Sequence, residues 1–129
     1  MLEPRGELVL RTLAMPADTN PNGDIFGGWL LSQMDIAGGI AAKQRSHSRI
    51  STVAIESMSF HQPVNVGDVV CCYAEILHVG TTSMRIKLEV WITNMPFNQQ
   101  RVKVTEGIFT FVAIDEDGRP QPVDRDECL

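Results

Sequence analysis

The chain has 129 residues, of which 43% are hydrophobic and 21% charged, and its formal net charge is −5. This length suits one domain and leaves too few residues for two separate cores, so we expect a single domain over residues 1–129. The acidic balance argues against a nucleic-acid-binding protein, which usually carries a basic patch. It still allows an anionic ligand, because local arginines and helix-end amides bind phosphate in acidic proteins.

The first third of the chain predicts a strand, a loop and a long helix. Residues 7–15 (ELVLRTLAM) are rich in Leu and Val, as in a short strand. Residues 16–24 hold two prolines, two asparagines, two aspartates and a glycine, which predicts tight turns. From Gly28 onward the residue types are helical, and Lys43 and Arg45 supply the positive charge preferred at a helix C-terminus.

The remainder of the chain predicts strands separated by turns, because its apolar residues alternate with polar ones, most clearly in SMRIKLEVWIT. The residues NMPFNQQ (94–100) predict a loop before the last strand. The expected strands cover residues 50–60, 69–79, 83–93 and 101–115. Strands joined by short turns form an antiparallel sheet. The predicted fold class is therefore α+β, a curved antiparallel sheet wrapped around one central helix.

Asp35 is the helix residue that most strongly indicates function. Residues 29–42 are apolar apart from Asp35 and two other polar residues, which predicts a buried helix. A carboxylate is rarely placed in a core without a reason. Gly38 and Gly39 lie on the same helix face and are expected to leave an empty groove beside it. We predict that a reacting molecule binds there, the alternative being a structural pairing with an arginine or a backbone amide.

The start of the helix offers a second element of a site. Gly27 and Gly28 allow a ligand to approach the free N–H groups at the helix N-terminus. These amides could stabilise negative charge developing on a carbonyl oxygen, as an oxyanion hole does, although the glycines could equally serve only the turn. In the preceding loop, Asn20, Asn22 and Asp24 add polar side chains, most of which turn formation explains. Amides and carboxylate together predict hydrolysis of an acyl group.

The remaining side chains capable of catalysis carry weaker signals. His47, His61 and His78 have no recognisable nucleophile motif nearby, although sequence distance does not exclude a Ser-His-Asp triad. No paired histidines or Cys/His set with metal-ligand spacing is present. Cys71 and Cys72 lie in an apolar run and predict buried thiols, which together with Cys128 suit a reducing cytosol. No signal peptide and no stretch of about 18 apolar residues is seen, so we expect a cytoplasmic protein outside the membrane.

Read as a whole, the sequence resembles the YciA-type acyl-CoA thioesterases of the hot-dog superfamily. The resemblance is carried by NGDIFGGW and SQMD, and continues through STVAIESMSF, PVNVGDVVCCYAEI, GTTS, EVW and FTFVAID. It extends from about Glu7 to Asp115. It implies a five-stranded sheet around one helix, homodimers with active sites shared between two chains, and assembly as trimers of dimers, that is, hexamers. The implied reaction is hydrolysis of acyl-CoA to a free acid and CoA without metal or organic cofactor, in fatty acid metabolism.

The resemblance also assigns roles to individual residues. It implies that Asp35 is the catalytic carboxylate, that Asn20 and Asp24 supply polar groups, and that Gly27 and Gly28 bind the thioester carbonyl. It further implies that a turn and an arginine hold the CoA portion of the substrate; these residues are Gly80, Thr81, Thr82 and Ser83 in the turn, and Arg49. The loop NMPFNQQ departs from the expected pattern and could alter the rim of the site.

Two mechanisms and two other functions remain open from the sequence. Asp35 could act as general base on water, or attack the thioester directly to form a mixed anhydride. A related hot-dog enzyme, a hydroxyacyl-thioester dehydratase, would need a histidine working with a carboxylate, and no histidine has a recognisable position relative to Asp35. A non-catalytic acyl-CoA-binding module usually accompanies a DNA-binding segment, and this chain has no basic stretch.

Overall fold

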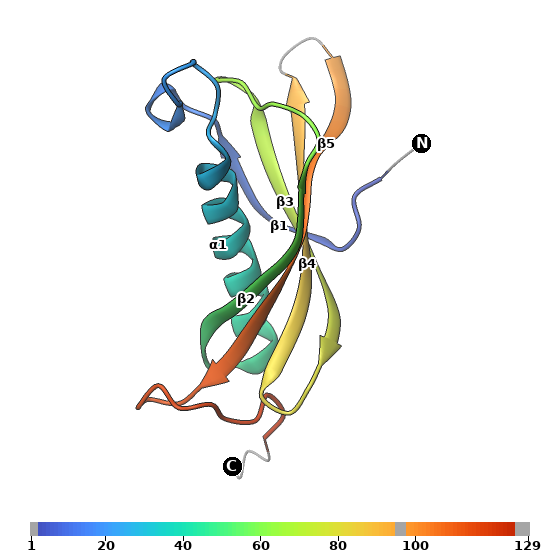
Figure 1. Cartoon of the computed structure of the whole chain (residues 1–129). Coiled ribbons are helices and arrows are strands. Elements are labelled where there is room, and N and C mark those ends of the chain that lie inside the picture. The colour runs from blue at the N-terminus through green and yellow to red at the C-terminus, as the bar shows by residue number, and fades with distance from the viewer. Residues whose placement is uncertain (1–2, 95–97, 126–129) are drawn as a thin grey trace.

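The computed structural model describes residues 3–94 and 98–125, and their side chains in residues 3–93 and 101–125. Five strands form one antiparallel sheet in the order β1-β3-β4-β5-β2. The elements are β1 (Glu7–Leu13), a short 3-10 helix η1 (Pro16–Asp18), α1 (Gly27–Ser46), β2 (Arg49–Phe60), β3 (Val69–Val79), β4 (Ser83–Asn94) and β5 (Asn98–Ile114). The sheet twists and curves across one side of α1 (Figure 1), which confirms the predicted α+β architecture.

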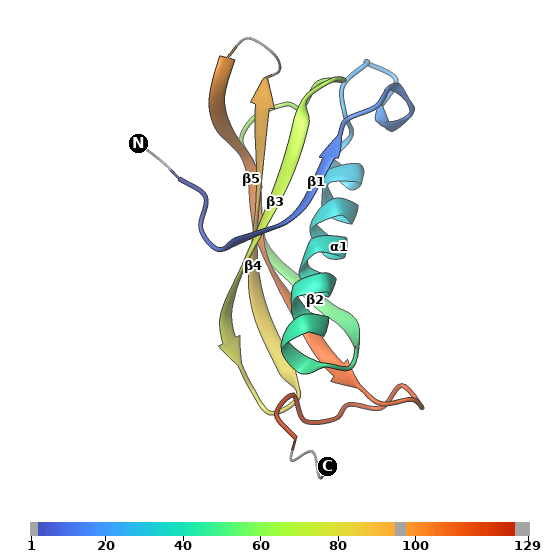
Figure 2. The same cartoon turned by 180° about the vertical axis from the view of Figure 1, so that it is seen from behind.

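The core lies between α1 and the concave face of the sheet. The alternation in β4 places Met84, Ile86, Leu88, Val90 and Ile92 against the helix, and all five are buried. Phe109 and Phe111 on β5 pack beside them with stacked rings. Apolar residues at every second position on a strand bury one face of a sheet, and this face positions the helix (Figure 2).

Some boundaries differ from the sequence prediction. The helix begins one residue earlier, at Gly27, and ends at Ser46, followed by His47 in the left-handed conformation. The strand β4 reaches Asn94 and β5 begins at Asn98, so the predicted loop 94–100 is wrong at residues 94 and 98–100, because pairing between β4 and β5 continues to Asn94 and Asn98. Residues 95–97 of that loop, like Cys128, lie outside the described residues.

The prediction of a fully buried helix is also wrong for the single chain. Leu30, Met34 and Ala37 are buried, but Ile36 is 49% exposed and Ile40 is 36% exposed. A helix that is apolar all round needs cover on every side, and the sheet covers only one. The opposite face of α1 is therefore an uncovered apolar surface. No helix among the described residues is long and apolar enough to cross a membrane.

The convex face of the sheet carries a charged network that the sequence did not indicate. Glu89 on β4 is only 2% exposed. Its carboxylate accepts a 2.9 Å hydrogen bond from the indole of Trp91, and Lys87 and Lys103 lie 3.4 and 3.7 Å from it. The N-terminal segment crosses this face, and the backbone N–H of Arg5 donates to the same carboxylate. These partners compensate the burial of the Glu89 charge.

Candidate active site

Asp35 lies midway along α1 and is tied to the edge strand β2. The hydroxyl of Thr52 donates a 2.6 Å hydrogen bond to Oδ1 of Asp35. Asp35 is half-buried, whereas Thr52 is exposed, so the carboxylate sits at the margin of the core with its second oxygen available. Thr52 carries no motif, and no local pattern predicts that a strand residue 17 positions after Asp35 contacts it.

The glycines after Asp35 do not leave an empty groove, contrary to the sequence prediction. A Cβ on Gly38 would lie 2.6 Å from the ring of Phe111 and 3.2 Å from Leu88. Gly38 therefore allows the helix to approach the sheet closely, and Phe111 fills the space. A Cβ on Gly39 would meet Ile50 at 3.5 Å, an ordinary contact. Access to Asp35 is on the side of β2 and the uncovered helix face.

The helix start presents unsatisfied amides to solvent. Phe26 is the N-cap and makes no side-chain capping bond. Its carbonyl accepts from Trp29 and Leu30, and no hydrogen bond recorded among the described residues uses the N–H of Gly27 or Gly28. Both glycines are exposed. An exposed helix N-terminus with free donors is suited to bind a negatively charged oxygen.

The loop before the helix is held by Asn20. The side-chain oxygen of Asn20 accepts hydrogen bonds from the backbone N–H groups of Asn22, at 2.9 Å, and Asp24, at 3.1 Å. This turn occupies the oxygen of the amide and leaves its NH₂ group to act as a donor. Within the described part of this chain, no hydrogen bond joins Asn20 or Asp24 to Asp35, so the structure does not bring these predicted site residues together in one protomer.

Helix geometry also separates the amides from the carboxylate. Gly28 and Asp35 are seven residues apart on α1, which corresponds to about 10 Å along a helix that rises about 1.5 Å per residue. A water that attacks a carbonyl lies about 3 Å from both its base and the carbonyl carbon. Gly28 and Asp35 of the same chain could therefore act on one thioester only if the amide, the carbonyl, the water and the carboxylate lay in a fully extended line.

The residues implied in CoA binding lie at the other end of the helix. The turn 80–83 joins β3 to β4, and its Thr81 and Thr82 carbonyls accept from the backbone N–H groups of Val123 and Ala113. Arg49 begins β2 and donates to the carbonyl of Glu116 at 3.3 Å. The turn and Arg49 thus contact the same C-terminal stretch, at the lower end of the molecule in Figure 1. This end is far from Gly27 and Gly28.

A serine, a histidine and a glutamate do meet on the convex face, but not as a catalytic triad. Ser59 Oγ lies 3.2 Å and Glu106 Oε2 lies 3.5 Å from the same atom, Nε2 of His61. A triad needs the acid and the nucleophile on opposite ring nitrogens. Cys72 is not a nucleophile candidate either, because burial raises the pKa of its thiol to about 12, with a further contribution from Cys71.

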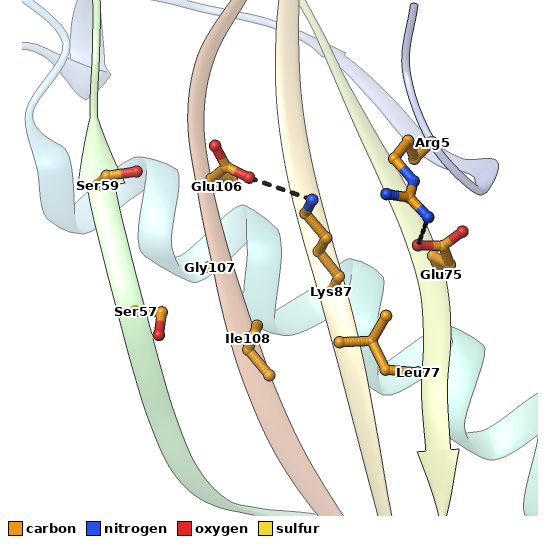
Figure 3. Close-up of a pocket in the computed structure, with 9 residues that line it drawn as sticks. All are labelled: Arg5, Ser57, Ser59, Glu75, Leu77, Lys87, Glu106, Gly107 and Ile108. Carbon is orange, nitrogen blue, oxygen red and sulfur yellow. Dashed lines mark ion pairs between the residues drawn. The ribbon is translucent and has the colours of Figure 1, made fainter.

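A pocket of about 440 Å³ lies beside these residues on the convex face. Figure 3 shows its charged side chains, which come from three strands and from the N-terminal segment. They are paired among themselves: Lys87 lies 3.3 Å from Glu106, and Arg5 lies 3.4 Å from Glu75. The hydrogen bond from Lys103, opposed by partial burial, holds the pKa of Glu106 below its usual value. The pocket therefore offers no unpaired acid or base, and Asp35 remains the stronger candidate.

The chain is similar to known thioesterases over most of its length. The family model of the Thioesterase superfamily matches residues 22–96. The acyl-CoA thioester hydrolase YciA of Salmonella typhimurium is 60% identical over 122 residues, covering 93% of this chain and 92% of that protein. A hexameric thioesterase from Yersinia pestis superposes with a TM-score of 0.89 at 54% identity, covering 96% of this chain and 100% of that one.

A more distant solved structure was determined with ligands. It is an acyl-CoA hydrolase from Staphylococcus aureus in complex with butyryl coenzyme A, coenzyme A and coenzyme A disulfide. It superposes with a TM-score of 0.81 at 28% identity, covering 88% of this chain and 68% of that one. These likenesses confirm the predicted hot-dog fold. The chain belongs to the Thioesterase superfamily and, within it, to the YciA-type acyl-CoA thioester hydrolases.

Proposed function

We propose that this chain, a single hot-dog domain, is a cytoplasmic acyl-CoA thioester hydrolase in which Asp35 activates the attacking water. The observation that carries the proposal is the Asp35 carboxylate, oriented by Thr52 at the open side of α1. The likeness to acyl-CoA thioester hydrolases over almost the whole chain supports the substrate class. Two buried free thiols, Cys71 and Cys72, fit a reducing compartment.

The active site is formed by two protomers. Gly28 and Asp35 of one chain lie about 10 Å apart along the helix, a distance that only a fully extended line of amide, carbonyl, water and carboxylate would span, so the proposal takes the amide that faces Asp35 from a second copy. Two antiparallel α1 helices related by a two-fold axis near Ser32, midway between Gly28 and Asp35, would place the partner's Gly28 opposite Asp35. Each site would then contain the Asp35 carboxylate of one chain and an oxyanion-binding amide of the other, the two groups that the reaction requires.

The surface of the chain fits this dimer. The strand β2 is 12 residues long and forms one edge of the sheet, with no neighbour on its outer side among the described residues. Its Val53 and Ile55 are 56% and 42% exposed, and Ile36 and Ile40 of α1, the helix that packs against β2, are 49% and 36% exposed. A long edge strand with exposed apolar side chains is suited to pair with another chain. Three such dimers would form a hexamer, the assembly of the Yersinia pestis relative.

The reaction consumes one water per thioester. The carbonyl oxygen is held by the partner's Gly27 and Gly28 amides, and Asp35 takes a proton from water as the oxygen of that water attacks the carbonyl carbon. The C–S bond then breaks, and the departing CoA thiolate takes the proton from Asp35. The products are a free carboxylic acid and CoA. In the anhydride alternative, Asp35 itself forms the bond to carbon and expels the CoA thiolate, and water then hydrolyses the anhydride. Label in the Asp35 side chain after a single turnover in ¹⁸O-labelled water would reject the simple general-base route.

The loop of Asn20 and Asp24 and the turn 80–83 with Arg49 are placed to bind different parts of the substrate. In an antiparallel pair of helices, the partner's Asn20 and Asp24 loop lies beyond the partner's Gly28, towards the Arg49 end of the first chain. The NH₂ group of Asn20 is then a donor for the carbonyl oxygen or for water. Arg49 and the turn 80–83 are in position for the phosphates and pantetheine of CoA, where an arginine binds phosphate well.

The first experiment is thiol release from a panel of acyl-CoAs by the wild type and by Asp35→Asn. We expect release by the wild type and a loss of about 100-fold or more in kcat for the variant, with CoA binding kept. CoA binding without thiol release by either protein would instead support the acyl-CoA-binding module. Hydration of enoyl-CoA would support the dehydratase. An active Asp35→Asn protein would move the catalytic role to the loop of Asn20 and Asp24.

Mixing two inactive variants tests whether the site is shared. Gly28→Pro removes the N–H of residue 28, and Asp35→Asn removes the base. In a mixed dimer with a shared site, one of the two sites has both lesions and the other has neither, so activity returns. If each site used its own Gly28 and Asp35, every site would carry one lesion and mixing would restore nothing. Far-UV circular dichroism of both proteins checks that the helix is intact.

A further inference from the structure

We infer that Met58 sets the length of acyl chain that the site accepts, and that the chain enters the protein between Met58 on β2 and Met34 on α1. This inference rests on the proposed function, since it concerns where the acyl group of that substrate goes.

A β-bulge aims Met58 at the interior. Glu56 pairs with Ile108 and Ser59 pairs with Glu106, so Ser57 and Met58 together stand opposite Gly107. Ser57 has a φ of 57°, in the left-handed region that non-glycine residues rarely adopt. Bulges that redirect a side chain occur next to active sites, and strained residues cluster at ligand-binding positions. β2 has another register shift against β5, between Thr52 and Ala54.

Gly107 provides the space that Met58 occupies. A Cβ on Gly107 would lie 2.2 Å from Sδ of Met58 and 3.6 Å from Cε of Met34. The thioether of Met58 therefore fills the place of the missing side chain, between the strand and the helix. Figure 3 shows Gly107 between Glu106 and Ile108, with the charged pocket on its other face. An apolar guest entering from the helix side would meet methionine side chains.

This place is continuous with the helix start. Phe60, two residues after Met58, is 55% exposed, and its ring lies 3.6 Å from where a Cβ of Gly27 would be. Phe60, Met58 and Met34 thus mark an apolar path that leads inward from the amides proposed to bind the thioester carbonyl, and their side chains fill it, so an acyl chain would have to displace them. An acyl chain attached to that carbonyl would follow this path into the protomer that supplies the amides.

A methionine side chain can adjust the depth of such an apolar path. Its side chain is unbranched and has several rotatable bonds, so it fills a gap when the site is empty and moves aside for a guest. Met34 is fully buried, whereas Met58 is half-buried and on a bulge. Met58 is therefore the one expected to move.

The test compares the ratio of kcat/KM for lauroyl-CoA to that for butyryl-CoA. In Met58→Ala we expect the ratio to rise about tenfold or more, because each methylene accommodated in an apolar pocket changes discrimination about tenfold or more. Met84→Ala is the matched control, since Met84 is fully buried on β4 and pairs with Phe111, away from the bulge. It should leave the ratio unchanged even if it lowers stability.

The substitution Gly107→Ala tests the same site by reducing the space that the Met58 side chain occupies. Its methyl group displaces the Met58 thioether into the acyl path, so the ratio should fall about tenfold. The double variant Gly107→Ala, Met58→Ala should restore a ratio at or above that of the wild type, because the displaced side chain is gone. A Gly107→Ala effect that persists in the double variant would show that Met58 does not transmit it.

The outcomes separate the two proposals. If the wild type hydrolyses no acyl-CoA, the proposed function fails. If it hydrolyses them but the ratio in Met58→Ala stays within about twofold of the wild type, or changes equally in Met84→Ala, only the inference about Met58 fails. Should Met58→Ala not give a folded protein, Met58→Val removes less volume and is judged by the same ratio, with the same result overturning the inference.

Discussion

Thr52 Oγ1 donates a 2.6 Å hydrogen bond to Asp35 Oδ1, and this contact fixes the carboxylate of the central helix against the exposed edge of the sheet. One carboxylate oxygen is thereby engaged, and the other is left to accept a proton from water. The contact makes Thr52 a positioning residue for Asp35.

Thr52→Val removes the hydroxyl and keeps the shape of the side chain. We expect kcat to fall about tenfold or more with little change in KM, because a misoriented base weakens the transition state more than substrate binding. Thr52→Ser should recover most of the activity. Thr12→Val, on the opposite edge strand β1, is the control. A Thr52→Val enzyme with unchanged kcat would show that Asp35 needs no such support.

A charged residue on the exposed apolar surface of α1 and β2 should dissociate the proposed dimer. Ile36→Asp or Val53→Asp would place a carboxylate in an apolar interface, which is costly to bury. We expect the mass measured by light scattering to fall and thiol release to be lost together, because each site needs two chains. Val66→Asp, at a comparably exposed turn residue (44% exposed), should change neither. A fully active monomer would contradict the shared site.

Gly38 and Gly39 should respond oppositely to alanine. At Gly38 the new methyl group meets the buried Phe111 ring at 2.6 Å, so we expect a loss of about 1–3 kcal/mol in the free energy of unfolding. At Gly39 the nearest atom is 3.5 Å away, so higher helix propensity should stabilise the protein by up to about 1 kcal/mol. Urea titrations at equal protomer concentration measure both. Equal effects would mean that the approach of Phe111 does not decide the choice of glycine.

The Glu106 network should make stability depend on pH at its acid end. The hydrogen bond from Lys103 lowers the pKa of Glu106 in the folded protein, so its stabilising effect is present above the unfolded-state pKa and lost as pH falls through the folded value. We expect Glu106→Gln to lower the urea midpoint at neutral pH, and the difference from the wild type to shrink below about pH 5. A difference independent of pH would show that packing, not ionisation, is responsible.

Arg49 should contribute only to binding of the nucleotide phosphates of CoA. Arg49→Gln is expected to raise KM for acyl-CoA about tenfold, and to leave hydrolysis of the matching acyl-pantetheine, which lacks the nucleotide phosphates, unchanged. Arg11→Gln, an exposed arginine on β1, is the control. An equal effect of Arg49→Gln on both substrates would place its role in folding or in the reaction itself.

Much of this protein follows from the sequence by itself. The alternation in β4, the turn residues after β1 and the charge at the end of α1 determined the elements and their order, because these signals are local. The isolated carboxylate at Asp35 and the glycines at the helix start were also visible, since a polar group in an apolar helix stands out without any structure.

Only the tertiary structure decided what surrounds those residues. The contact of Thr52 with Asp35, the ring of Phe111 against Gly38 and the bulge that aims Met58 at Gly107 all join positions far apart in the chain, and no local pattern encodes them. The rise of α1 decided that Gly28 and Asp35 of one chain lie about 10 Å apart along the helix, because a helix fixes the distance between its residues. The apolar pattern of α1 predicts a buried helix, but the sheet covers only one side of it, so the single chain leaves Ile36 and Ile40 exposed.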